Sequence, residues 1–154
     1  MQSRSKGFTL VELLVVIGIV GILLAITLVA INPARQFAQA NNAKRTADVN
    51  AILNAVTQLK VDNRGQLPTG VAIPAIATLF SNTDAGLAAL CTAIVPTYIA
   101  ALPIDPTATG AVFTSCSAFD TGYEILQSTT GRVTISAPDS EEISGVKPTI
   151  AVSR

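Results

Sequence analysis

An uncharged run near the N-terminus constrains the fold of this chain more than any other feature. The residues from Leu13 to Ile31 include no charged side chain, and about 20 apolar residues in a helix cross the hydrocarbon core of a bilayer. Arg4 and Lys6 lie just before the run, so the positive-inside tendency places the N-terminus in the cytoplasm and the rest outside. We therefore expect a single-pass protein of the cytoplasmic membrane whose folded module lies beyond the run.

One carboxylate, Glu12, lies within the apolar N-terminal stretch. A charge near the middle of a membrane costs about 2.5 to 3.5 kcal/mol on insertion scales. If the chain is cut between Gly7 and Phe8, the new amine of Phe8 enters the same apolar environment, where it can pair with Glu12 of a neighbouring copy and set the axial register. The alternative is a Glu12 near the bilayer surface, stabilised by the helix N-terminus without a partner. The residues alone leave both open.

The residues that follow the basic leader are Gly7-Phe8-Thr9-Leu10-Val11-Glu12. They resemble the prepilin motif of type IV pilins and type II secretion pseudopilins. The resemblance implies that a membrane prepilin peptidase/methyltransferase cleaves after Gly7 and methylates the amine of Phe8, and that Glu12 acts in assembly. It further implies partners of three kinds: copies of the chain in a filament, an inner-membrane assembly platform and membrane lipid.

The helix is expected to continue past the membrane run as far as Asp62. Asn32-Pro33 should interrupt or kink it, because proline lacks a donor and clashes with the preceding turn, and Asn63-Arg64-Gly65 is a stop signal. The i, i+3, i+4, i+7 spacing predicts an apolar face made of Ala34, Phe37, Ala38, Val49, Ile52, Leu53, Val56 and Leu59. The residues available for the opposite, polar face are Lys44, Arg45, Asp48, Asn54 and Gln58.

Beyond Gly65 the composition changes to Pro, Thr, Ala and Gly with short elements. A short helix is expected over 84–94, capped by Asn82, Thr83 or Asp84, and a weak second turn over 98–102. The strand candidates are 112–117, 123–128 and 132–137, the last two joined by a hairpin loop at 129–131. Residues 139–154 are a polar tail that either adds a strand or stays irregular.

These elements predict an α+β, type IV pilin-like fold, in which a long N-terminal helix packs on a small antiparallel sheet. The expected division is a leader at 1–7, a transmembrane and filament-core helix at 8–31, an amphipathic continuation at 32–64 and a C-terminal head at 65–154.

Cys91 and Cys116 are the two cysteines of the chain. Two cysteines cannot build a four-ligand zinc site. Because the membrane signal carries the C-terminal part into an oxidising compartment, we interpret them as a possible disulfide. Its loop of about 26 residues would stabilise the head by about 3 kcal/mol. Two buried free thiols are the alternative.

The chain has no histidine, so it lacks the commonest general base and metal ligand at neutral pH. We expect no catalytic residue, no enzyme activity, no cofactor and no bound metal, and no basic cluster indicates a nucleic-acid site.

The resemblance extends into the head at lower strength, and the segments that carry it are 62–68, 102–106 and 122–125. Residues 107–121 depart from the usual pseudopilin pattern and include Cys116. A calcium site, known in some of those heads, would draw on Asp105 and Asp120, although each is better interpreted as a turn residue.

The leading interpretation is a structural subunit of a type IV pilus-like filament. A pseudopilin of a type II secretion system is one alternative. Another is a monomeric membrane-anchored binding module, for which Glu12 would be dispensable. An anchored hydrolase has no supporting set of residues, because any triad would need an unusual base.

Overall fold

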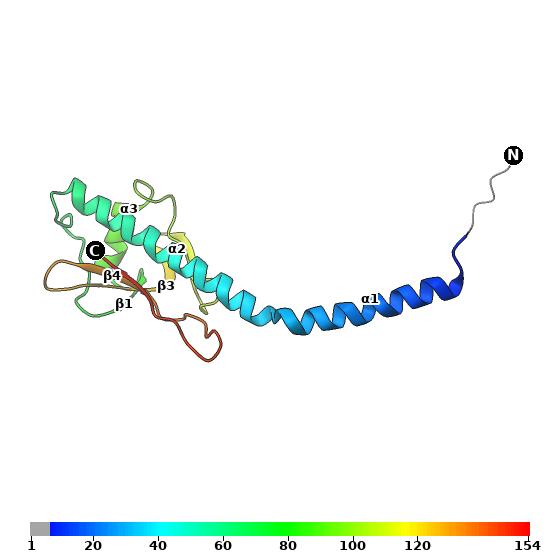
Figure 1. Cartoon of the computed structure of the whole chain (residues 1–154). Helices are drawn as coiled ribbons and strands as arrows, with labels where there is room; N and C mark the ends of the chain where they lie inside the picture. Colours follow the sequence, from blue (N-terminus) through cyan, green and yellow to red (C-terminus); the bar gives the residue numbers. More distant parts are fainter. Residues whose placement is uncertain (1–6) are drawn as a thin grey trace. The chain divides into compact units, whose positions relative to one another are not determined.

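The computed structural model describes residues 7–154, so the basic leader residues Arg4 and Lys6 lie outside the described residues. The chain divides into two compact units, the first ending at Phe37 and the second running from Ala38 to Arg154. The elements in order are α1 (Leu10–Ile31), α2 (Pro33–Asp62), β1 (Thr78–Ser81), α3 (Ala85–Ile94), β2 (Val112–Ser115), β3 (Ala118–Gln127), β4 (Val133–Ala137) and β5 (Ile150–Ser153) (Figure 1).

The first unit contains α1, drawn in blue in Figure 1. Its 22 residues extend about 33 Å at 1.5 Å per residue, which matches a hydrocarbon core of about 30 Å. Within the described part of the chain it is the one helix long and apolar enough to cross a membrane, with a mean hydropathy of 2.8 over Leu10–Leu28. The side chains over this span are all exposed. A helix that is apolar on every side requires a non-aqueous environment.

Asn32 separates the two long helices, as Asn32-Pro33 predicted. It ends α1 in a left-handed conformation with φ 45°, and Pro33 begins α2, where its missing N–H is not needed. The Asn32 side chain then caps the new helix, because its Oδ1 accepts from Arg35 N at 3.3 Å. α2 ends at Asp62, and Arg64 and Gly65 both have positive φ beyond it, which confirms the predicted stop.

The predicted apolar face of α2 is correct within the second unit and wrong before it. Ala34 and Phe37 are exposed, Phe37 by 69%. They lie in the first unit, and the hydrophobic core of the described residues begins only at Val49. The buried apolar residues of α2 are Ala38, Val49, Ile52, Leu53, Ala55, Val56 and Leu59.

The second unit is built on an antiparallel sheet with strand order β1-β3-β4-β5, in which β2 pairs with β3. The central strand β3 places Ile125 opposite Thr78 of β1 and Ile135 of β4. Phe119, Tyr123 and Ile125 of this strand are buried. They join side chains of α2 and α3 in one hydrophobic core.

The predicted short helix is confirmed as α3, capped by Asp84, whose Oδ1 accepts from Leu87 N at 3.0 Å. The weak second turn at 98–102 is wrong. The turn follows directly on α3, because the amides of Tyr98 and Ile99 both donate to Ile94 O, and it ends at Tyr98.

The three predicted strands are present as β2, β3 and β4, although β3 begins earlier than expected, at Ala118. The tail forms β5, which pairs with β4. β1 was not predicted, because no strand was expected between Gly65 and the short helix at 84–94. Cys91 of α3 and Cys116 form a disulfide with a Cα–Cα distance of 5.5 Å. The disulfide prediction is confirmed.

Candidate functional site

The chain enters α1 through Gly7, Phe8 and Thr9, which have no regular secondary structure. Phe8 is 82% exposed. A Cβ added at Gly7 would meet no heavy atom within 4 Å, so the packing of the described residues does not require glycine there.

Thr9 and Glu12 form a capping box at the start of α1. Thr9 Oγ1 accepts from Glu12 N at 3.2 Å, and it donates to Glu12 Oε2 at 2.8 Å. The backbone N–H of Thr9 donates to the same Oε2, also at 2.8 Å. The box satisfies backbone donors that the first helical turn cannot pair internally.

The capping box uses one of the two carboxylate oxygens of Glu12. Within residues 7–154, no hydrogen bond reaches Oε1. An ionised carboxylate has acceptor capacity for about four hydrogen bonds, so Glu12 can take a further donor. It is also the one ionisable side chain of α1, and among residues 7–154 it contacts Thr9 and no cation.

A second polar cluster lies in the head around Arg45, which was assigned to the polar face of α2 and is instead fully buried. Its guanidinium binds Asp105 with two bonds, Nε to Oδ2 at 2.6 Å and Nη2 to Oδ1 at 3.0 Å. Nη1 donates to Asn42 Oδ1 at 2.9 Å and to Glu141 Oε1 at 3.4 Å, and Nη2 also donates to Thr107. The earlier assignment followed residue type, whereas Arg45 continues the helical spacing of the buried face.

Asp105 serves as a turn residue and as the partner of Arg45. Its Oδ1 accepts from the backbone N–H groups of Thr107 at 2.8 Å and Ala108 at 3.0 Å. Burial by itself raises the pKa of Asp105. The hydrogen bonds from Arg45 and from these two amides together lower the pKa by more than burial raises it, so it lies below its ordinary value.

Asp120, the other residue considered for calcium, accepts from Gly122 N at 2.9 Å, as a turn residue does. Both oxygens of Asp105 are engaged by Arg45 and backbone donors. Across the described residues, no group of three or more cysteine, aspartate or glutamate side chains could hold a metal ion.

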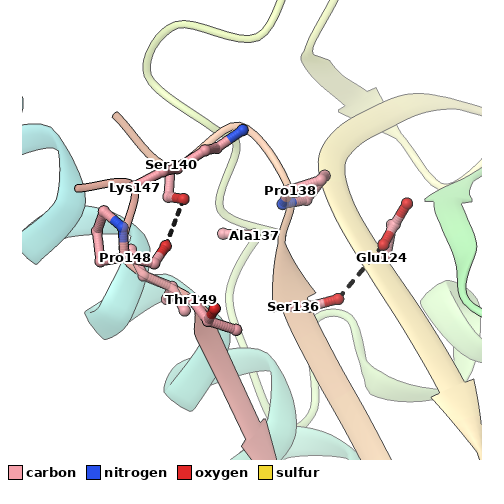
Figure 2. Close-up of a pocket in the computed structure, with 9 residues that line it drawn as sticks. Glu124, Ser136, Ala137, Pro138, Ser140, Lys147, Pro148 and Thr149 are labelled. Carbon is pink, nitrogen blue, oxygen red and sulfur yellow. Dashed lines mark hydrogen bonds between the residues drawn. The ribbon is translucent and has the colours of Figure 1, made fainter. Parts of the chain in front are cut away.

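A hollow of about 230 Å³ lies on the head where β4 ends and β5 begins (Figure 2). Its two serine hydroxyl groups are used within the fold, since Ser136 Oγ donates to Glu124 at 3.5 Å and Ser140 Oγ donates to Pro148 O at 2.6 Å. In the described part of the chain, no buried side-chain nitrogen or oxygen lacks a hydrogen-bond partner. The hollow therefore presents no unpaired buried group to a ligand.

A long apolar N-terminal helix, a second helix and a small antiparallel sheet form an α+β, pilin-like architecture. Comparison with known families agrees: residues 2–28 match the prokaryotic N-terminal methylation motif, which is the prepilin-type motif of type IV pilins and pseudopilins. No curated protein and no solved structure gives a significant match. This motif is typical of structural subunits. It implies processing by a prepilin peptidase and assembly into pilus-like filaments. Together with the apolar helix α1, it indicates membrane anchoring.

Proposed function

We propose that the chain is a structural subunit of a type IV pilus-like filament. It is inserted in the cytoplasmic membrane with its N-terminus inside, cleaved after Gly7, methylated at the new amine of Phe8 and polymerised through α1. The observation that carries the proposal is an apolar helix, exposed on all sides, with one carboxylate near its start. The role is structural, and it requires no catalytic residue, cofactor or metal.

Access to the chain before α1 supports the cleavage step. A peptidase needs an exposed, non-helical segment, and residues 7–9 have that form. Because the fold sets no steric demand on Gly7, recognition by the peptidase accounts for the glycine. Arg4 and Lys6 hold the leader on the cytoplasmic side by the positive-inside tendency.

The charge of Glu12 supports polymerisation. Two unit charges at about 4 Å attract by about 4 kcal/mol at an effective dielectric constant of 20, while a charge deep in the membrane costs about 2.5 to 3.5 kcal/mol. The Phe8 amine enters the same apolar environment and carries a cost of its own, so its contact with Glu12 of another copy offsets more than half of the cost of burying the two charges together. Apolar contacts along α1 then add the packing that holds neighbouring helices together.

One observation favours a second candidate, a monomeric membrane-anchored module with α1 as a simple anchor. The capping box already gives Glu12 two hydrogen bonds within its own chain. If those bonds are sufficient near the bilayer surface, no second copy is required. The two candidates differ in whether Glu12 is dispensable.

Replacement of Glu12 decides between them. We expect Glu12→Ala and Glu12→Gln to leave the protein inserted and cleaved, as measured by membrane fractionation and intact mass, but absent from the sheared filament fraction. Thr27→Val is the matched control, because the Thr27 hydroxyl is also a polar group of α1 but is satisfied by Leu24 O at 2.9 Å. A normal filament yield from Glu12→Ala would refute the assembly role and leave the anchor.

Mass spectrometry of the protein recovered from cells tests the processing. The expected mature chain begins at methylated Phe8, and Gly7→Leu should retain the leader. If Gly7→Leu still loses the leader mass, the cleavage site is wrong. In a deletion strain, loss of surface filaments would indicate a pilus, whereas loss of protein secretion with intact surface filaments would indicate a pseudopilus.

A further inference from the structure

We propose that the two ends of the head bind each other in successive copies of the chain, so that an acidic loop of one copy seats in a cationic hollow of the next. The acidic loop is residues 138–149, and the cationic hollow lies where α2 ends. The inference rests on the proposed function, because it says which surfaces of the head meet when copies of the chain polymerise.

The acidic loop and the cationic hollow lie at opposite ends of the head along α2. Asn42, near the start of the second unit, donates from Nδ2 to Glu141 O in the loop at 2.7 Å. Lys60, in the last turn of α2, donates to Gly131 O at 2.7 Å. The two anchoring residues of α2 are about 27 Å apart at 1.5 Å per residue. Figure 1 shows the loop and the turn between β3 and β4 at opposite ends of the head.

Four cationic residues gather where α2 ends: Lys60, Arg64, Arg132 and Arg154. Backbone contacts bring them together, because Val133, next to Arg132, exchanges two backbone bonds with Arg154, at 2.7 and 2.9 Å. Lys60 and Arg154 line a hollow of about 260 Å³ together with Val61 and Val133. Val61 is 69% exposed. The cationic hollow therefore combines positive charge with an apolar contact surface.

The positive charge of this end is not neutralised within the head. In the part of the chain that the structure describes, the cations of the ion pairs are Lys44 and Arg45 and none of these four. The acid that lies among them in the sequence, Asp62, accepts from the Tyr98 hydroxyl at 2.7 Å. Charges of one sign around a hollow attract a group of the opposite sign. The end of α2 is therefore suited to an acidic partner.

The acidic loop carries the complementary charge. Asp139 and Glu142 are exposed, and the ion pairs among residues 7–154 do not use them. Glu141 is engaged inside the head, because Arg45 donates to it at 3.4 Å. Lys147, the one cation of the loop, lines the separate hollow of Figure 2. Two acids of the loop are therefore available to a second copy.

The tip of the acidic loop is a tight turn next to an exposed apolar residue. Ile143 and Val146 exchange two backbone bonds, at 2.8 and 3.1 Å, around Ser144 and Gly145, which both have positive φ. Val146 is 66% exposed. A contact in which Val146 meets Val61 of the next copy, with acids and cations around it, has the apolar centre and polar rim of a protein interface.

A contact between two different surfaces suits a filament. An interface that joins one end of a copy to the other end of the next is heterologous, and it continues into an open array unless its rotation closes a ring. A contact of one end with the same end of a second copy would stop at a dimer. The proposed contact therefore adds to the packing of α1 and orders the heads along the filament.

Charge reversal tests the contact in cells. The hollow variant is Arg64→Glu/Arg132→Glu and the loop variant is Asp139→Lys/Glu142→Lys, and all four side chains are exposed, so urea unfolding should show a folded head. We expect each variant to lower the yield of sheared filaments per mole of cleaved subunit by about fivefold or more, because like charges then face each other. Combining all four substitutions should restore at least about half of the wild-type yield.

Lys147→Glu is the matched control for the added negative charge. It lies on the acidic loop, so the proposed contact predicts no loss of filaments from it. Wild-type yields from both reversal variants, no recovery in the combined variant, or an equal loss from Lys147→Glu would each overturn the proposal.

Crosslinking identifies what occupies the cationic hollow. In sheared filaments treated with a short bis-maleimide, Val61→Cys/Val146→Cys should give a ladder of covalent oligomers, whereas each single variant should give monomers. Monomers from the double variant would overturn the proposal. Dimers from Val61→Cys alone would also overturn it, because they would show that like ends meet.

The outcomes separate this contact from the proposed function and from a different occupant. Absence of filaments from wild type would overturn the proposed function. If the hollow variant forms filaments at wild-type yield but these lose their retention on immobilised heparin, the cationic hollow binds an acidic polymer and not a second copy, and the proposal is wrong.

Discussion

Replacing Arg45 by methionine should destabilise the head by about 3 to 5 kcal/mol, because removal of one partner leaves a buried charge uncompensated. Arg45 and Asp105 have no exposed side-chain surface, and two bonds of 2.6 and 3.0 Å join them. In Arg45→Met, Asp105 keeps only the amides of Thr107 and Ala108 and the Thr107 hydroxyl as donors. The predicted loss is a large part of the 5 to 15 kcal/mol that stabilises a typical domain.

Urea unfolding of the full chain in mild detergent measures this loss. The chain contains two tyrosines and no tryptophan, so tyrosine fluorescence reports on the head without a background from α1. Lys44→Met is the matched control on the same helix. Its ion pair with Asp48 is partly exposed, and such pairs contribute about 0 to 1 kcal/mol.

The double variant Arg45→Met/Asp105→Asn tests the reason for the loss. Asparagine keeps an oxygen that can accept from Thr107 N and Ala108 N, but it carries no charge. The double variant should therefore recover about 1 to 3 kcal/mol relative to Arg45→Met. If Asp105→Asn gives no recovery in the Arg45→Met background, the uncompensated charge is not what destabilises the head.

The same pair sets the response of the head to acid. The pKa of Asp105 in the folded head lies below its ordinary value, so its contribution to stability is fully present above the unfolded pKa of about 3.9 and is lost as pH falls through the folded pKa. Wild type should therefore lose more unfolding free energy below about pH 4 than the double variant does. Equal slopes in the two proteins would contradict this assignment.

Three further predictions concern the head. The double variant Cys91→Ala/Cys116→Ala should lose about 3 kcal/mol in urea unfolding. Burial, and then the hydrogen bond to Asp48, raise the pKa of Tyr123, so the folded head should lose stability as pH rises above the unfolded value of about 10, and Tyr123→Phe should weaken that dependence in urea unfolding. EDTA should leave the thermal midpoint unchanged, because donors of the chain already engage Asp105.

Features that depend on neighbouring residues could be predicted from the sequence. The break at Asn32-Pro33 follows from the geometry of proline, and α3 follows from its cap at Asp84. β1 could not be predicted, because Thr78–Ser81 is short and has no regular alternation of apolar and polar residues. Its strand conformation depends on pairing with β3, about 40 residues away.

Residue type and position gave conflicting predictions on α2. Phe37 continues the apolar spacing but lies before the head begins at Ala38, so no core of the second unit includes it. Arg45 lies on the buried series, but a charged side chain is almost never fully buried unless it is paired. Its partners Asp105 and Glu141 are 60 and 96 positions away, where helical periodicity gives no information.

Glu12 and Arg45 show why the surroundings of one charged side chain can be predicted from the sequence and those of the other cannot. Each charge needs hydrogen bonds wherever water is excluded. Glu12 finds its donors on Thr9, three positions away, so a short motif can encode the whole arrangement. Arg45 finds its main acceptor only after the head has folded. In the proposed function, assembly and head stability therefore depend on separate charges, and Glu12→Ala should leave the urea midpoint of the head unchanged while Arg45→Met lowers it.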